Sequence, residues 1–476
     1  MSPATARRTF ALVSALTWLP TALGIATMVL LMQVRGLSLA GVGVAFAAYG
    51  ITVAILELPT GGLADVIGRR TVLAVSAGVG IAAMLGMAFA TSLWQFVALS
   101  MLKGVSRALS SGPAEAWYVD TVSRPRVSIA ASASERGAER ARRRTTDTAG
   151  SADETALRQG LAAGHTAGAA ALAIGTIAGG VLPLLVPKGH GVLVPLSVPM
   201  LLAAVAAGLQ LAVVLARMPE PPRAHRPGFG EVLRGVPATI GRGLRLGVRD
   251  HMLARVMLSG AALGFSLNAI EMLTPGRLAQ LTGDAAAGST AYAVVAAIGF
   301  GAVAVGSALG GVVARLIGGP ARTAALGLAV AAVSLGGLAA SAGLTGLAGI
   351  VAAAAAYTGM FLGLGITNPV RSELMHQRVT GAERATVLSV FSFVLMVGGT
   401  GSVPLGALAA RWSVAPAWWI AAAVLLGSAA LYLGRPARSA GDAVFAGVQV
   451  HPAGSQEADQ GHPELAGQVH GEGAGR

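Results

Sequence analysis

The sequence predicts an all-α integral membrane protein with twelve transmembrane helices in two six-helix halves. The 476 residues are 54% hydrophobic and only 12% charged, with a mean hydropathy of +0.68. A soluble domain carries about 25% charged residues, so the surplus apolar surface must face lipid. A helix that crosses a bilayer needs about 20 mostly apolar residues, and twelve stretches of the chain meet this requirement.

The first six stretches build an N-terminal half at 10–215, after a short tail at 1–9. They lie at 10–32, 40–62, 71–90, 94–116, 159–186 and 192–215. The first is too long for the apolar core of a signal peptide and has no clear cleavage site, so it is expected to remain as a span. A basic loop is expected at 117–158, and its part at 124–158, which has few large apolar residues, is expected to be mobile.

The segment 216–253 is the longest polar break and separates two equal sets of spans. Its prolines at the start stop a helix, and an amphipathic run after them is expected to form a surface helix in a central linker. The C-terminal half at 254–433 contains the stretches 254–276, 288–313, 323–342, 346–370, 385–409 and 414–433. The polar tail at 434–476 cannot bury enough apolar surface to fold and is expected to be disordered.

The distribution of positive charge predicts the orientation. An even number of spans places both termini on one side, and 28 of the 34 Lys and Arg residues then lie on that side. Positive residues gather on the cytoplasmic side of a membrane, so both termini are expected in the cytoplasm of a cell with this protein in its inner membrane. The net charge of +13 thus reflects topology and contact with the lipid bilayer, and nucleic acid is not an expected partner.

The run GGLADVIGRR at 61–70 connects the second and third spans by a charged hairpin that packing alone does not explain. It resembles the conserved G-x-x-x-D-R-x-G-R-R loop of the major facilitator superfamily. The matching residues are Gly61, Asp65, Gly68, Arg69 and Arg70, and Val66 replaces an arginine. The resemblance implies a conformational latch in which a helix N-terminus carrying Arg384 receives Asp65. The alternative is a positive anchor with an acidic cap.

A weak internal repeat supports two related halves. GGVVARLIGGPAR at 310–322 ends the eighth stretch, six after GGLADVIGRR, and has Ala314 where the acid would stand. Parallel repeats of this kind build the two halves of facilitator transporters.

The fourth stretch carries Lys103, Arg107, Ser111 and Glu115 at steps of four residues, which predicts one stripe along a helix. Charges within a span normally face a cavity or a partner. Arg107 resembles the span-4 arginine of proton-coupled drug exporters. It stays protonated, so it is suited to holding a carboxylate or an anion, while structural pairing is the alternative, above all for Lys103.

Three carboxylates are candidates for proton coupling: Glu57, Glu115 and Glu271. Glu57 lies in the second stretch and has pairing with Arg107 or Arg69 as its alternative.

Glu271 lies in the seventh stretch, three residues after Asn268, so the two share a helix face that is expected to line the cavity. Pairing of Glu271 with Arg277 is the alternative.

The fifth stretch contains ALAIGTIAGG, which resembles the antiporter signature G-x-x-x-G-P-x-x-G-G of exporters. Gly175, Gly179 and Gly180 match, whereas Ala171 and Thr176 depart from the pattern. Small residues at this spacing also serve close helix packing in other membrane proteins.

These features predict a proton-coupled exporter of small amphipathic compounds, such as drugs or secondary metabolites, that works by alternating access. The proton gradient supplies the energy, and no cofactor, metal or catalytic residue is expected, since the chain has no cysteine, no GxxxxGK[ST] and no HExxH. A monomer is expected, and 32 arginines against 2 lysines indicate a bacterial source. The alternatives are a nutrient importer or facilitator, a membrane sensor or scaffold with partner-recruiting basic loops, and, more remotely, a membrane enzyme.

Overall fold

The computed structural model describes residues 1–122, 138–187, 191–220, 241, 245, 250–379 and 381–433. Within these ranges it leaves out the side chains at 58, 59, 61, 62, 65, 138–154 and 381–386. Met1–Gly434 form one compact unit, distinct from Arg435–Arg476. The described residues contain helices and turns but no strand, so the all-α prediction is confirmed.

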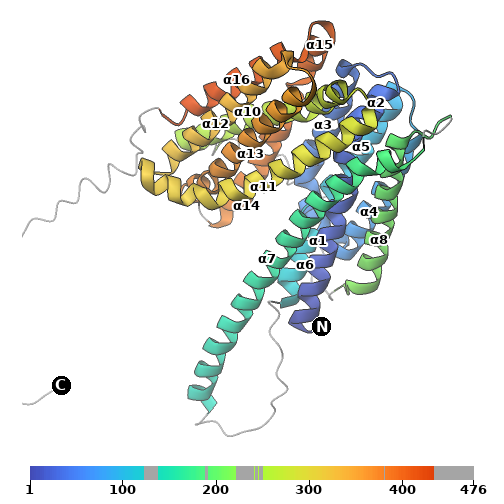
Figure 1. Cartoon of the computed structure of the whole chain (residues 1–476). Coiled ribbons are helices and arrows are strands. Elements are labelled where there is room, and N and C mark those ends of the chain that lie inside the picture. The colour runs from blue at the N-terminus through green and yellow to red at the C-terminus, as the bar shows by residue number, and fades with distance from the viewer. Residues whose placement is uncertain are drawn as a thin grey trace, which may run out of the picture. The chain divides into compact units, whose positions relative to one another are not determined.

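Within the described residues, the first half consists of the α-helices that Figure 1 labels α1 to α8. They are α1 (Pro3–Ile25), α2 (Met28–Val34), α3 (Leu39–Ile67), α4 (Arg69–Phe89), α5 (Leu93–Ser110), α6 (Pro113–Val122), α7 (Ala138–Leu185) and α8 (Val198–Arg217), with a 3-10 turn at Pro195–Ser197 before α8. The predicted first span is divided into α1 and α2. The fourth is divided into α5 and α6 because Gly112 takes a positive φ of 91° and Pro113 starts a new helix.

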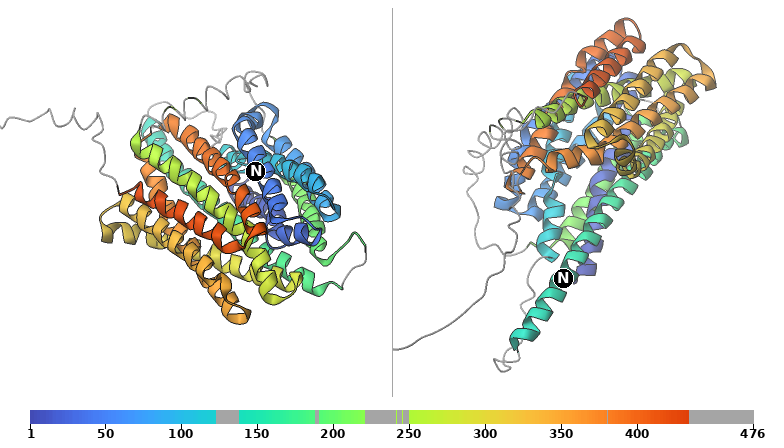
Figure 2. Two further views of the ribbon diagram at one scale, coloured as in Figure 1. Left: turned by 90° about the horizontal axis from the view of Figure 1, so that it is seen from above. Right: turned by 90° about the vertical axis from the view of Figure 1, so that its left-hand side faces the viewer.

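Helix α7 begins 21 residues before the predicted fifth span and projects beyond its neighbours (Figures 1 and 2). The prediction of a loop over 117–158 is therefore wrong in the described part, where α6 ends at Val122 and α7 starts at Ala138. The start of α7 is rich in Ala, Glu and Arg, which are strong helix formers. Their propensity supports a helix even without large apolar residues.

Within the part of the chain that the structure describes, the second half contains seven α-helices. They are α10 (His251–Thr282), α11 (Ala285–Ile317), α12 (Pro320–Ala340), α13 (Gly346–His376), α14 (Gly381–Thr400), α15 (Val403–Arg411) and α16 (Val414–Ala430), with a 3-10 turn at Ser341–Gly343. Every predicted apolar stretch coincides with at least one helix. Within the described ranges, ten helical segments are long and apolar enough to cross a membrane. A multi-pass membrane protein is thus confirmed, while the count of twelve spans stays a prediction.

The two predicted spans missing from these ten have simple explanations. Helix α5 carries Lys103 and Arg107 within 18 residues, which lowers its mean hydropathy. Helix α16 has only 17 residues. Both nevertheless pack as members of the bundle, α5 against α3 and α4, and α16 against α10 and α12.

Helix pairing in the first half recurs in the second. The pairs α1·α7, α3·α5 and α4·α8 are matched by α10·α14, α11·α13 and α12·α16. The halves meet where α3 packs on α14 and α15, and where α7 packs on α11. Figure 2 shows the blue-to-green helices beside the yellow-to-red ones. The cavity described below lies between these two sets.

Two predicted segments fall largely outside the described residues. Helix α8 ends at Arg217, and most of the linker 216–253, including its expected surface helix, is not described. The same holds for the tail 434–476. We use "linker end" for the end of the bundle where Gly68 and Glu220 meet, and "hairpin end" for the opposite one.

Candidate functional site

A cavity of about 400 Å³ lies between the two halves. Helices α1, α2, α3, α5 and α7 line it from the first half, and α10, α11 and α14 from the second. Pockets of ~300–1,000 Å³ commonly hold drug-sized ligands, so this one is large enough for a small organic molecule. Its charged lining residues are Lys103, Arg107 and Glu271.

The first-half wall carries two cations held against aromatic rings. The guanidinium carbon of Arg107 lies 4.8 Å from the centroid of the Trp18 ring, and Lys103 Nζ lies 5.3 Å from that of Tyr49. These are cation–π distances, which orient the charged groups without neutralising them. Among the described side chains, neither cation forms an ion pair. Lys103 and Arg107 thus both line the cavity with their charged groups next to aromatic rings.

The second-half wall carries Glu271 on α10. Its side chain is exposed to the cavity and makes no hydrogen bond or ion pair with the described part of the chain. Arg277, the alternative partner, instead donates to the carbonyls of Ala342 and Leu344, both at 2.6 Å. The alternative pairing of Glu271 with Arg277 is therefore wrong.

Asn268 lines the same cavity one helical turn from Glu271, as expected from their spacing. Its Nδ2 donates to the Gly399 carbonyl and to Ser402 Oγ, both at 2.8 Å. These acceptors lie where α14 gives way to α15. Asn268 therefore fixes the break between these helices as well as forming part of the wall.

Glu57 lies outside the cavity lining and joins the two halves. Its carboxylate accepts from Ser111 Oγ at 3.3 Å and from Ser392 Oγ at 2.7 Å. Ser392 belongs to α14 of the second half, so this contact crosses the interface. The alternative ion pairs of Glu57 with Arg107 or Arg69 are not formed.

The predicted stripe of four polar residues is interrupted after Arg107. Helix α5 ends at Ser110, Ser111 is its C-cap, and α6 starts at Pro113 in a new direction. Glu115 therefore leaves the cavity side and lies 3.7 Å from His165 Nε2, with both side chains at least half exposed. The prediction of one continuous stripe was wrong because the Gly-Pro pair breaks the helix.

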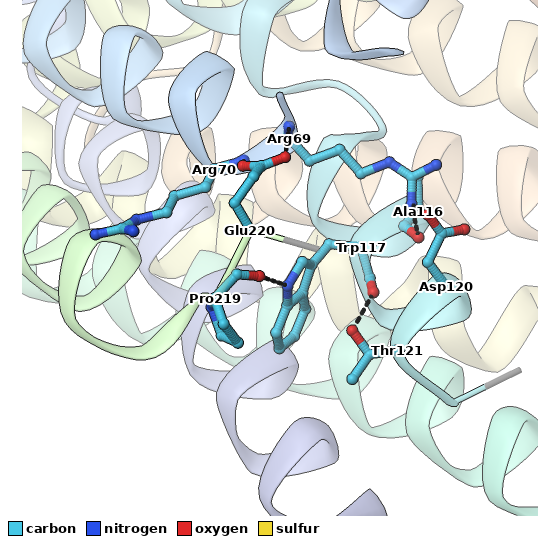
Figure 3. Close-up of polar contacts among 8 residues, drawn as sticks. All are labelled: Arg69, Arg70, Ala116, Trp117, Asp120, Thr121, Pro219 and Glu220. Carbon is cyan, nitrogen blue, oxygen red and sulfur yellow. Dashed lines mark hydrogen bonds and ion pairs between the residues drawn. The ribbon is translucent and has the colours of Figure 1, made fainter. Parts of the chain in front are cut away.

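Gly68 forms the turn between α3 and α4 with a φ of 112°. The Glu220 carboxylate accepts from the backbone N–H groups of Arg69 and Arg70, at 3.2 and 3.0 Å, and so caps α4 (Figure 3). A Cβ at position 68 would lie 2.9 Å from this carboxylate. Both the positive φ and the close approach of Glu220 require glycine here.

The two arginines after Gly68 bind other helices of the first half. Arg69 pairs with Asp120 and donates to the Ala116 carbonyl, both on α6, and Arg70 donates to the Leu215 carbonyl of α8 at 2.5 Å. Figure 3 shows Arg69 and Asp120 directed toward each other.

Nearby, Trp117 Nε1 donates to the Pro219 carbonyl at 3.1 Å, which fixes the chain just before Glu220. The side chains of Asp65 and Arg384 lie outside the described part, and Gly61 is described only as backbone of α3. Their predicted latch contact stays a prediction.

The glycines of the antiporter-like motif separate into two packing roles. A Cβ at Gly175 or Gly179 would collide with α1, at Ala22 and at the Leu23 carbonyl respectively. A Cβ at Gly180 would collide with Ala293 of α11 in the other half. Small residues here let helix backbones touch.

The Gly180 carbonyl also accepts from Ser289 Oγ and Thr290 Oγ1, both at 2.8 Å. These two hydroxyls belong to the start of α11, so the halves are joined at the hairpin end. Neither hydroxyl was predicted as a site residue.

Other residues of the site were also missed. Trp18 and Tyr49 carried a usable signal, since they stand within spans rather than at the interfaces where such residues are enriched. Glu220 stands among prolines directly after a span, which marks it as a capping candidate. Ser392 and Asp120 carried none, because their partners are distant in the sequence.

The described residues contain no group of three His, Asp or Glu side chains that could hold a metal ion. The described side chains of the cavity are suited to binding a ligand through charge, hydrogen bonds and aromatic contacts.

Similarity to known proteins agrees with the helical membrane fold described above. Residues 10–135 match the sequence profile of the Major Facilitator Superfamily. None of the curated proteins compared with the chain matches it. Solved structures with the same fold include the nucleoside transporter NupG, with 13% identity, a TM-score of 0.67, and coverage of 90% of this chain and 98% of that one.

Two further structures are similar over a comparable length. A bacterial homolog of the human lysosomal transporter Spinster, in an inward-facing and occupied conformation, has 12% identity, a TM-score of 0.65, and coverage of 91% and 97%. A POT family transporter in complex with 5-aminolevulinic acid has 11% identity, a TM-score of 0.63, and coverage of 90% and 95%. The predicted resemblance to the superfamily is confirmed.

Proposed function

We propose that this multi-pass membrane protein, which has the fold of the Major Facilitator Superfamily, is a secondary active transporter. Its two halves rock about the shared cavity, so that the cavity opens to one side of the membrane and then to the other. The transported compound is small and amphipathic. Transport is export, driven by protons that enter as the substrate leaves.

One observation carries this proposal: Lys103 and Arg107 face Glu271 across a single cavity between the halves. Charged side chains within a membrane are costly and mark substrate or ion pathways. Repeat-built transporters place their binding site at the interface of the repeats. Charged candidate residues from both halves thus share the location that alternating access needs.

Glu271 is the leading candidate for the coupling proton. It is exposed to the cavity and makes no hydrogen bond or ion pair with the described residues, so a proton and a substrate can both reach it. Glu57 is the second, because protonation would weaken its acceptance from Ser392 and loosen the two halves. Glu115 is the third and has the least support, since it lies beside His165 away from the cavity.

The direction of transport rests on resemblance. Arg107 and the Gly175–Gly180 pattern resemble exporters, and the excess of arginine at the linker end favours a cytoplasmic location for that end. We place the protein in the inner membrane of a bacterium, acting as a monomer, with no cofactor beyond the proton gradient. The latch formed by Asp65 and Arg384 would hold the linker end closed.

Inverted membrane vesicles test this proposal. The vesicles are energised to an acidic lumen, a panel of amphipathic compounds is added, and luminal pH is followed with a fluorescent dye. An exporter releases luminal protons when its substrate is added. We expect this leak to be lost in Glu271→Gln and reduced in Glu57→Gln and Asp65→Asn.

Glu373→Gln is the matched control, since Glu373 is an exposed carboxylate on α13 that accepts from Gln377 at 2.9 Å and does not line the cavity. It should retain the leak. Absence of leak with every compound, from well-inserted protein, would contradict export and favour a nutrient importer, which concentration-dependent uptake in intact cells would then reveal. Loss of cellular function on deletion of 124–158, with Arg107→Ala unaffected, would favour a sensor or scaffold.

A further inference from the structure

The cavity carries charges of opposite sign on opposite walls, and from this we infer the class of its substrate. We propose that the compound is an aromatic zwitterion, with its anionic group at Lys103 and Arg107 and its protonated amine at Glu271. The inference rests on the proposed transport function and specifies the ligand of the same site.

The separation of charge follows the two halves. Both cations are on α5 of the first half, and the carboxylate is on α10 of the second. All three line the same cavity, and none forms an ion pair with another described side chain. Lys103 and Glu271 attract each other across the cavity without direct contact, and among the described side chains Arg107 has only the Trp18 ring beside it. These charges therefore lack the direct partner that a charge inside a membrane protein normally has. A ligand with one negative and one positive group supplies both partners at once.

Ligands with a single charge fit this arrangement less well. A cation without an acid group would bind Glu271 but leave Lys103 and Arg107 uncompensated. An anion without an amine would bind these two and leave Glu271 uncompensated. Hydrogen bonds between ionised partners are about twice as strong as neutral ones, so the site favours a ligand that forms them on both walls.

Aromatic rings surround the charged groups on both sides. Trp18 and Tyr49 hold the two cations in the first half, and Tyr292 and Phe300 line the cavity from α11. Aromatic rings prefer offset-stacked or edge-to-face contact with other rings. An aromatic body on the ligand therefore fits between the two charged ends.

The aromatic wall of the second half is supported from behind. Tyr292 Oη lies 3.3 Å from Tyr357 Oη, and their rings meet edge to face at 5.9 Å between centroids. Tyr357 in turn stacks on Phe361 at 4.6 Å, and Phe361 meets Phe300 at 6.2 Å. This network fixes the orientation of both rings, and because Tyr292 is buried, the preformed aromatic surface is that of the half-buried Phe300.

Four matched probes test the inference: phenylalanyl-phenylalanine with both ends free, its N-acetyl form, its C-terminal amide, and the doubly capped form. Binding is measured by calorimetry on the purified full-length protein in detergent. We expect the free dipeptide to bind tightest, and each cap to weaken binding by about tenfold or more, since each removes one charge-assisted contact.

Substitutions in the protein test which end of the ligand contacts which wall of the cavity. In Glu271→Gln the difference between free and N-acetylated probes should disappear, while the preference for a free carboxylate remains. In Lys103→Gln and in Arg107→Gln the difference between free and amidated probes should shrink instead. Glu373→Gln and Arg315→Gln change exposed charges that do not line the cavity and should keep the original order of affinities.

Other outcomes overturn the inference. The inference is wrong if the doubly capped probe binds as tightly as the free dipeptide, or if a singly charged probe binds more tightly. It is also wrong if no probe binds to protein whose unfolding temperature is normal. Because this assay needs no transport, its failure can be told apart from failure of the proposed function. Proton leak with other compounds would support the transport function and contradict a zwitterionic substrate. Binding of the zwitterion without any leak would support the ligand class and contradict proton-coupled export.

Discussion

At the scale of single residues, the turn after α3 shows how one glycine and one acid organise a region. Gly68 permits the positive φ, and Glu220 approaches so closely that any side chain at 68 would meet its carboxylate. Glu220 stands at the start of the linker that joins the halves. The loop at 61–70 is therefore tied to the linker through the N-terminus of α4.

Gly68→Ala should destabilise the protein by about 1–3 kcal/mol, because alanine is strained at this φ and its Cβ meets Glu220. The thermal unfolding temperature in detergent measures the effect. Gly78→Ala on α4 is the control, since a Cβ there has open space around it and should be neutral or slightly stabilising.

Glu220→Ala separates the two causes. Alone it should lower stability by about 0.5–2 kcal/mol through loss of the α4 cap. In the Glu220→Ala background, Gly68→Ala no longer causes a collision, although the backbone strain remains. Gly68→Ala should therefore lower the free energy of unfolding by less in this background than in the unmodified protein. Strict additivity of the two effects would show that Glu220 does not approach Gly68 as described.

At the scale of elements, helix positions were predictable and helix ends were not. Long apolar runs mark helices, since only a helix satisfies its own backbone within lipid. The break inside 94–116 was signalled by Gly112–Pro113 but hidden by the regular spacing of Lys103, Arg107 and Ser111. The N-terminal part of α7 was not predicted because helices were identified by their apolar residues. In this segment helix propensity, rather than apolarity, favours the helix.

The glycine motif in α7 makes a prediction about packing. Gly179→Ala should destabilise the first half by about 1–3 kcal/mol, because its Cβ would meet the Leu23 carbonyl of α1, a backbone atom that cannot turn away. Unfolding in detergent again measures it. Gly208→Ala on α8, where a Cβ meets nothing within 4 Å, is the matched control. An equal loss in both variants would contradict a packing role for Gly179.

At the scale of the whole molecule, hydrogen bonds between described residues join the halves at two places. Ser392 donates to Glu57 between α14 and α3, and Ser289 and Thr290 donate to Gly180 between α11 and α7. The repeat in helix pairing was predictable from GGLADVIGRR and its weak second copy. These contacts between halves were not, because single hydroxyl groups carry no pattern that reveals a partner more than a hundred residues away.

Ser392→Ala and Gly180→Ala should shift the conformational equilibrium in opposite directions. The first removes a contact toward the linker end, worth about 0.5–1.5 kcal/mol, and the second places a methyl group against α11 at the hairpin end. The chain has no cysteine, so Thr400→Cys provides a single reporter in the cavity.

Labelling of Thr400→Cys by an impermeant maleimide, applied separately to each face of vesicles, measures the shift. Ser392→Ala should increase labelling from the linker-end face, and Gly180→Ala from the other. The double variant should return toward the unmodified ratio. Changes in the same direction for both would contradict two opposing closures.

The volume of the cavity has an osmotic consequence. At about 30 Å³ per molecule, 400 Å³ corresponds to a dozen or more water molecules. A state that closes around substrate must release that water, and a state that opens must take it up from one compartment. The balance between open and closed states therefore depends on water activity. Large solutes that cannot enter the cavity should favour the closed state, so osmotic stress would shift this balance without any change in ligand concentration.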